Sequence, residues 1–416
     1  RGLGDVYKRQ GKMMNHPKKL CLLLALFCCT AVGTAAAAMP ASGEAGLTAE
    51  APLFVPSAAG KEAVSAKKDN AAAGDAKENK KGKDTMLVKP AAVVTDDTLA
   101  LHRLTERDFT FNGMRAGDSL QKVKAIFGSP TKYAQSDHYT ELKYDRTDLR
   151  MRVRLRNEPA DFLKEAAEGR KAVQPGVESV TLASGDAVYI GPGIHLGHPA
   201  ELLVRKYGAP LNVLRDADAN VYYFVYENPS KDHILIFAIG ERKVARVALI
   251  PPRPPYVTDQ SETQINGRSA RDFTLVGYGV NEPFVPNKYN MWTNMVKRGT
   301  SHFWLYGSYG LEVDRHNMVK KVFLLNNSSF TGRGATLGYR VSTLLALYGQ
   351  PDRIEKGPAG EEYVDAYYYD SPFQKGVSLV FINKHATDYI DDVLLISEPI
   401  KNIQDPMERY GLKDEE

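Results

Sequence analysis

The sequence predicts an α+β fold of tandem units, each a short helical segment packed on an antiparallel sheet of three to four strands. Three observations predict it. A pattern of glycines and one proline, G-x-x-x-G-x(10)-G-x-P, occurs three times along the chain. Apolar residues recur at intervals of three and four after its second glycine, as on one face of a helix. Runs rich in Val, Ile, Tyr and Phe follow each G-x-P, as expected of strands.

The N-terminal region is set apart from the fold. Residues 1–12 precede the first Met and read as a non-native scar. Residues 13–38 combine a basic start, an apolar run and a stretch of small residues, which is the layout of a secretory signal peptide cleaved before Met39. The apolar run of roughly 13 residues is shorter than the ~20 that a membrane-spanning helix needs. We therefore expect an exported protein, periplasmic or extracellular, without a transmembrane segment.

The cysteines all lie inside this expected signal peptide, at positions 21, 28 and 29. The mature chain would then contain no disulfide. Lipidation of Cys28 or Cys29 is the alternative, but the residues before them, Phe27 and Cys28, are not the small residues expected there. A lipid-anchored form is disfavoured.

Residues 39–94 are rich in Ala, Lys, Gly, Asp and Glu. Such a segment buries too little apolar surface to offset its chain entropy, so we expect a disordered tether.

The repeated motif marks one amphipathic helix of about ten residues in each copy. Each helix would begin after the second glycine and end at G-x-P, because glycine suits a left-handed C-terminal position and proline cannot continue a helix. The motif residues are Gly113, Gly117, Gly128 and Pro130; Gly193, Gly197, Gly208 and Pro210; and Gly334, Gly338, Gly349 and Pro351.

A longer repeat marks the start of a further unit, which is divergent and the third along the chain. The sequence of residues 107–113 closely matches that of residues 271–277, but the unit that follows Gly277 has lost the second glycine and the G-x-P. The expected division is 95–182 for unit 1 with an insertion, 183–251 for unit 2, 252–270 for a Pro-rich linker, 271–327 for divergent unit 3, 328–400 for unit 4 and 401–416 for a polar tail.

The motif with its following strands resembles the β-lactamase-inhibitor-protein/SmpA–OmlA (BamE-like) superfamily. The copy most similar to it has Gly117, Ser119 and Val123, followed by Phe127, Gly128 and Pro130. The resemblance implies BLIP-like two-layer units and a role in binding other proteins at or outside the envelope. It supplies no catalytic residues.

Other motifs favour structural interpretations. Gly191 to Gly197 follow an expected strand, Ala187–Ile190, but have one residue too many for a dinucleotide loop. His195 and His198 have a spacing that could bind a metal, yet no third ligand is evident. We expect Ser308 in a hairpin turn, and the acidic pairs at 361–362 and 391–392 in turns at the end of or between strands. The formal charge of only +4 disfavours nucleic-acid binding. We expect no catalytic site, cofactor or metal.

Aromatic residues in the strands are the candidate partner-binding side chains, because large aromatics anchor many binding surfaces. The candidates are Tyr222, Phe224, Tyr226, Trp292, Trp304, Tyr306, Tyr367 and Tyr369. The alternative is that they fill the core or the seam between units.

The functional hypothesis is an exported, non-catalytic protein-binding or scaffold protein of the cell envelope that acts through exposed sheet faces, with envelope or extracellular proteins as partners. The alternative is an outer-membrane-associated assembly lipoprotein of BamE-like type. A cell-wall hydrolase has the least support.

Overall fold

The computed structural model describes residues 103–157, 175–216, 220–257, 264–286, 294–357, 363–385 and 387–411. The expected scar, signal peptide, tether, the insertion that follows Asn157, and Trp292 lie outside the described residues. The described residues contain no cysteine, hence no disulfide, and none of their helices has the length and apolar character needed to cross a membrane.

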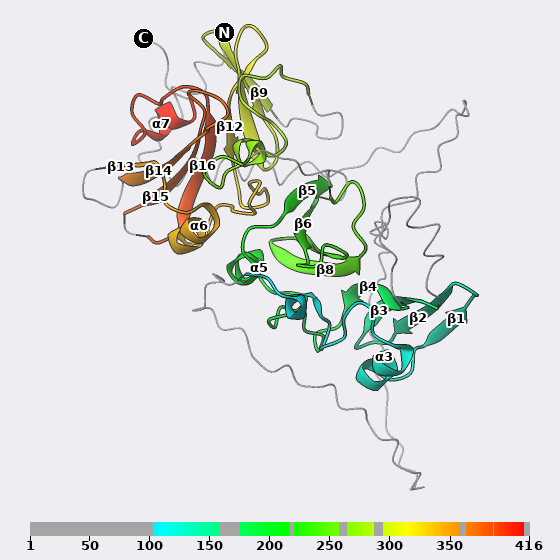
Figure 1. Ribbon diagram of the computed structural model, residues 1–416. Coiled ribbons are helices and arrows are strands. Elements are labelled where there is room, and N and C mark those ends of the chain that lie inside the picture. Colours follow the sequence, from blue (N-terminus) through cyan, green and yellow to red (C-terminus); the bar gives the residue numbers. More distant parts are fainter. Residues whose placement is uncertain are drawn as a thin grey trace, which may run out of the picture. The chain divides into compact units, whose positions relative to one another are not determined.

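The first half, residues 103–257, consists mainly of eight strands (Figure 1). They are β1 (Lys132–Gln135), β2 (Tyr139–Asp145), β3 (Arg150–Arg156), β4 (Gly176–Ser184), β5 (Asn212–Asp216), β6 (Val221–Glu227), β7 (Ile234–Gly240) and β8 (Lys243–Ile250). The helical elements are the 3-10 helix η1 (Glu106–Phe109), α3 (Leu120–Phe127) and α5 (Ala200–Tyr207).

The second half, residues 264–411, repeats this arrangement, with one helix fewer before its first strands among the residues that the structure describes. Its strands are β9 (Asn294–Arg298), β10 (Ser301–Leu305), β11 (Tyr309–Val313), β12 (Val319–Leu324), β13 (Arg353–Lys356), β14 (Val364–Asp370), β15 (Ser378–Lys384) and β16 (Ile390–Ile396). The helical elements are η2 (Ala270–Phe273), α6 (Val341–Tyr348) and α7 (Pro406–Arg409).

Each half forms one antiparallel sheet of eight strands, built from two four-stranded meanders. The order is β1-β2-β3-β4-β8-β7-β6-β5 in the first half and β13-β14-β15-β16-β12-β11-β10-β9 in the second. The last strands of the two meanders pair with each other, β4 with β8 and β12 with β16. The first strands β1, β5, β9 and β13 consequently form the sheet edges.

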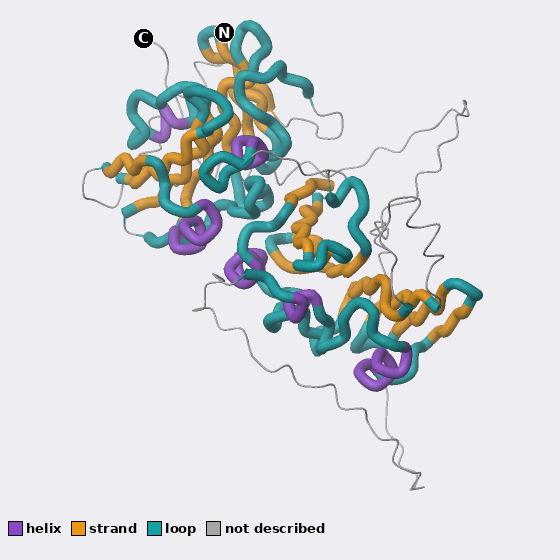
Figure 2. Tube along the Cα trace, viewed as in Figure 1, coloured by secondary structure: helices purple, strands orange, loops and turns teal. Residues whose placement is uncertain are grey.

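The expectation of an α+β fold, with a helix on its own three- to four-stranded sheet in each unit, is wrong. The described chain is mostly antiparallel β, with two eight-stranded sheets and only short helices (Figure 2). The error has a physical cause. The outer strand of a meander has unpaired backbone groups, and two meanders satisfy these groups by pairing with each other. Separate units would leave such edges open.

The helices nevertheless lie where the glycine motif places them. Helices α3, α5 and α6 each have eight residues and end at Gly128, Gly208 and Gly349, with φ angles of 76°, 75° and 74°. This left-handed conformation suits glycine, which explains why the third motif glycine recurs. The expected strand at Ala187–Ile190 is wrong, since only Ile190 forms isolated bridges there.

One cluster of buried apolar side chains contains residues of both sheets and of all three eight-residue helices. It includes Val123 of α3, Leu203 of α5 and Leu344 of α6, all fully buried. A second cluster lies on the opposite face of the second sheet, where Ile403 in the C-terminal segment packs with Ile382 and Ile396. The segment from 397 to 411 therefore covers this face.

A basic sheet face as candidate binding site

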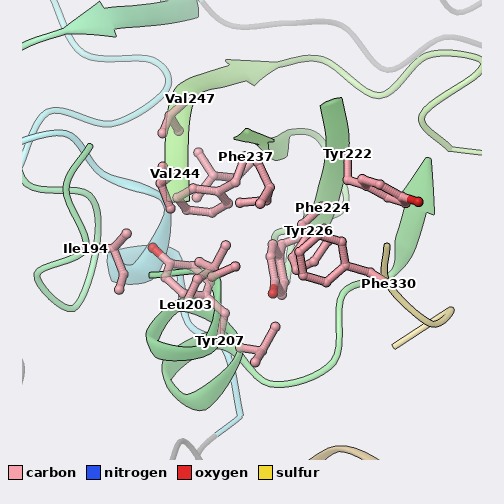
Figure 3. Close-up of a cluster of buried hydrophobic side chains, with 14 of the residues drawn as sticks. Ile194, Leu203, Tyr207, Tyr222, Phe224, Tyr226, Phe237, Val244, Val247 and Phe330 are labelled. Carbon is pink, nitrogen blue, oxygen red and sulfur yellow. The ribbon is translucent and has the colours of Figure 1, made fainter. Parts of the chain in front are cut away.

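The three aromatic candidates of β6 point into the core. Tyr222, Phe224 and Tyr226 are 3%, 0% and 1% exposed. The ring of Phe330, from the second half, lies 5.0 Å from that of Tyr222 and 5.2 Å from that of Phe224, nearly perpendicular to both (Figure 3). Tyr222 and Phe224 thus fill the seam between the two sheets, whereas Tyr226 packs on Tyr207 and Phe237 of its own half, and none of the three offers an exposed contact surface.

Tyr226 and Tyr369 share a specific role with Tyr144, which the sequence analysis did not single out. Each hydroxyl donates a hydrogen bond to the carbonyl of a helix-ending glycine: Tyr144 to Gly128 at 3.2 Å, Tyr226 to Gly208 at 3.2 Å and Tyr369 to Gly349 at 2.9 Å. Each ring also packs on the last aromatic residue of that helix, Phe127, Tyr207 or Tyr348. The same contact thus ties helix to sheet in three meanders.

The other aromatic candidates are also involved in packing. Tyr306 is 2% exposed and stacks on Tyr309 with centroids 4.6 Å apart. Trp304 is partly buried against Phe284, at 5.0 Å, and Tyr367 is partly buried against the main core. Among the described residues, the aromatic candidates therefore form no open binding surface.

The remaining polar candidates have structural partners. The rings of His195 and His198 lie 3.4 Å apart, but no group of three or more potential metal ligands occurs in the described ranges. Ser308 lies between β10 and β11 and hydrogen-bonds Ser329 at 2.7 Å. The expectation that Asp391 and Asp392 lie in a turn is wrong, because both belong to β16. Glu361 and Glu362 lie outside the described residues.

Strand β3 has a feature that none of the candidates above explains. Its residues alternate strictly between arginines, Arg150 to Arg156, and the buried side chains Met151, Val153 and Leu155. Because successive side chains of a strand point to opposite faces, all four arginines lie on the face away from the core. We call this solvent face of β1–β3 the basic face; it contains Lys132, Lys143, Arg150, Arg152, Arg154 and Arg156.

Cations lie directly opposite one another across the strands of the basic face. Lys132 of β1 is opposite Lys143 of β2, and Lys143 is opposite Arg152 of β3. On the far side of Arg152 stands the neutral Thr181 of β4. Directly opposed like charges destabilise a sheet, and the ion pair of Lys143 with Asp145 offsets only part of this cost.

The four arginines differ in their contacts. Arg156 is only 14% exposed and lies 3.6 Å from Glu178. Arg154 is 49% exposed, stacks 3.6 Å above the ring of Tyr139 and lies 3.5 Å from Glu178. Arg150 is 70% exposed, and its Nε lies 3.8 Å from the Asp145 carboxylate.

Arg152 is exposed, and within the described part of the chain it forms no ion pair. Lys143 does pair with Asp145 of its own strand, at 2.9 Å. Arg150, Arg152 and Arg154 are therefore available to an external anion.

Two of the three corresponding third strands, β7 and β15, present no such face. In β7 the corresponding side chains are Ile234, Ile236 and Ala238, all buried. In β15, Val380 and Ile382 are covered by the C-terminal segment. Strand β3 thus carries exposed arginines where these two related strands carry buried apolar residues.

Two clefts lie at equivalent places in the two halves, each between a 3-10 helix and a hairpin of the following meander. The larger, of about 390 Å³, includes Glu106, Asn228 and Ser230. The carboxylate of Glu106 accepts hydrogen bonds from the Asn228 amide and from the Ser230 hydroxyl and backbone N–H. These polar groups bind one another and indicate no ligand.

Sequence reasoning missed the basic face, although its signal is present. The run R-M-R-V-R-L-R at 150–156 has strict period-two alternation, and that pattern alone places all four guanidinium groups on one sheet face. The near-neutral total charge hid this local excess. A guanidinium group binds carboxylate or phosphate through two parallel hydrogen bonds, so the face can bind anions.

Comparisons with known proteins add little. No protein-family model and no curated protein matches the chain. Among solved structures, it is similar to a DUF4309 family protein, YjgB, from Bacillus subtilis subsp. subtilis str. 168. The sequence identity is 17%, the match covers 32% of this chain and 79% of that one, and the TM-score is 0.21. A likeness this low supports no conclusion on fold or function.

Proposed function

We propose that this chain is an exported, non-catalytic binding protein of the cell envelope, which holds an anionic partner on its basic face. One observation carries the proposal. Strand β3 exposes three arginines on a rigid sheet, at a position where two related strands are covered by apolar contacts. Arginine is enriched in binding surfaces, and a preorganised sheet lowers the entropy cost of binding.

This proposal revises where the partner docks. The sequence favoured the aromatic sheet faces, but the described aromatic candidates lie in the core or pack against it. The charges of the basic face instead favour a partner that carries closely spaced negative groups. Export remains a proposal based on the signal-peptide pattern of residues 13–38.

Co-sedimentation with envelopes isolated from the source organism tests the proposal. The test variant replaces Arg150, Arg152 and Arg154 by Thr, which removes three exposed charges and suits a strand. A matched control replaces Lys320, Arg353 and Lys356 of the second half by Thr. We expect the wild type and the control to sediment with envelopes and to be released by salt, whereas the test variant stays in solution. Equal sedimentation of all three proteins would refute the proposal.

A further inference from the structure

The accessible arginines form a line along one strand. Alternate residues of an antiparallel strand are about 6.8 Å apart, so Arg150, Arg152 and Arg154 span about 14 Å. Arg150 and Arg154 are 70% and 49% exposed, and Arg152 between them is exposed too. Stacking on Tyr139 fixes the guanidinium group of Arg154. The positive charges are thus evenly spaced along the direction of strand β3.

Acidic side chains border this line on both sides: Glu178 of β4 lies 3.5 Å from Arg154, and two further carboxylates lie on β2. Glu141 lies opposite Arg154, and Asp145 lies opposite Arg150. Neighbouring strands are about 4.8 Å apart, so a broad anionic surface that reached the arginines would also meet these two carboxylates. A ligand about one strand wide can contact β3 and avoid them. This geometry disfavours the plane of an anionic membrane.

The composition of the face argues against a folded acidic protein. Stable protein interfaces have an apolar centre depleted of charge. Here the centre is the cationic row Lys132, Lys143 and Arg152, and Tyr139 is the one aromatic side chain beside the arginine line among the described residues. An extended polyanion requires no such apolar centre, because release of counterions drives its binding.

We infer that the basic face binds a linear phosphodiester polymer, laid along β3 so that successive phosphates meet Arg150, Arg152 and Arg154. The inference rests on the proposed function and specifies its ligand. The planar guanidinium fork matches two oxygens of a phosphate or of a carboxylate, which favours arginine over lysine at these positions; comparison with a polycarboxylate of equal charge decides between the two groups.

Binding of three probes to the full mature chain tests this inference. The probes are poly(glycerol phosphate), poly-L-glutamate with the same number of charges, and vesicles of phosphatidylglycerol and phosphatidylcholine. Anisotropy measures the labelled polymers, and co-sedimentation measures the vesicles. We expect the tightest binding to poly(glycerol phosphate). The Arg150, Arg152 and Arg154 to Thr variant should bind it at least about tenfold more weakly, with a salt slope reduced by about two.

The same second-half control, with Lys320, Arg353 and Lys356 replaced by Thr, should bind like the wild type. Circular dichroism melting confirms that both variants fold. If polyglutamate or the vesicles bind as tightly as the phosphodiester and lose binding in the variant, the ligand assignment is overturned while the proposed function stands. If no probe distinguishes the variant from the control, both are overturned.

Discussion

Tyr226 shows how a single side chain links the sequence repeat to the fold. Its hydroxyl donates to the carbonyl of Gly208, its ring packs on Tyr207, and the same geometry recurs at Tyr369 and Tyr144. An aromatic residue chosen as a candidate for partner binding is therefore a structural contact. Buried hydroxyl groups of this kind contribute because leaving the carbonyl unpaired is costly.

Replacing Tyr226 with Phe should therefore destabilise the protein without disturbing its packing. We expect the free energy of unfolding to fall by about 1 kcal/mol, since one buried hydrogen bond is lost. Urea denaturation followed by circular dichroism measures it. Tyr363→Phe, at a side chain that is 41% exposed, is the control and should change nothing. Equal stability of the Tyr226 and Tyr363 variants would contradict this role.

The buried tyrosines also predict an alkaline limit to stability. Burial raises the pKa of Tyr144 to about 12 and the pKa of Tyr226 well above its ordinary value. In the unfolded chain these groups ionise near pH 10. The folded state therefore holds their protons more tightly. The stability that they contribute is complete below about pH 10 and is lost as the pH rises toward the folded-state values.

Urea denaturation midpoints should be constant from pH 8 to 9.5 and then decline. Tyrosinate absorbance in native protein should account for only the exposed tyrosines until unfolding begins. Complete ionisation near pH 10 without unfolding would show that the hydroxyls are accessible.

At the scale of the element, β3 carries a conflict between stability and function. Arg152 lies opposite Lys143, which in turn lies opposite Lys132, and each like pair opposes sheet formation. A strand selected only for folding would replace at least one of these cations. Binding proteins often retain such local costs at their sites.

Arg152→Thr should therefore leave the fold as stable as the wild type or stabilise it by about 0.5 kcal/mol at low salt. The gain should vanish at 1 M salt, because the Debye length falls to about 3 Å. Urea denaturation at two salt concentrations checks both. Arg156→Thr is the contrasting variant and should destabilise, since Arg156 is 14% exposed and pairs with Glu178. Loss of stability in the Arg152 variant would assign it a structural role.

The elements themselves could largely be predicted from local pattern. Helices after Gly117, Gly197 and Gly338 and strands such as Val221–Glu227 occur where periodicity places them. The polar edge strands Lys132–Gln135 and Arg353–Lys356 have no apolar alternation, so pattern did not reveal them. Pairing of β4 with β8 joins residues 65 to 69 positions apart, and no local signal specifies it.

The candidate site, too, could be predicted from the sequence only in part. Alternation in Val221–Glu227 identifies two faces but not what covers them, because Phe330, which packs on Phe224, comes from the other half of the chain. The arginines of β3 were readable from sequence, and only the exposure of their face required the structure.

For the whole molecule, the shared core joins the two sheets into one folding unit. Phe330 is 4% exposed and packs between Tyr222 and Phe224. Glu201 of α5 also accepts hydrogen bonds from the Arg340 backbone and the Thr343 hydroxyl at the start of α6. Contacts of this kind couple the unfolding of both halves.

Calorimetry of the wild type should accordingly show a single transition. Phe330→Ala should lower the free energy of unfolding by about 3–5 kcal/mol, or divide the transition in two, because it leaves a cavity at the seam. Phe373→Ala, at a side chain that is 37% exposed, serves as the control and should have little effect. Two well-separated wild-type transitions would show that the halves unfold independently.

The pairing of last strands has a consequence for the history of the chain. Strand β4 meets β8 as β12 meets β16, so each half resembles two copies of one meander related by an approximate twofold axis. A single meander would expose its last strand, and another copy would be its natural complement. Such a meander is suited to self-association, and gene duplication with fusion would convert that dimer contact into the present intramolecular ladder.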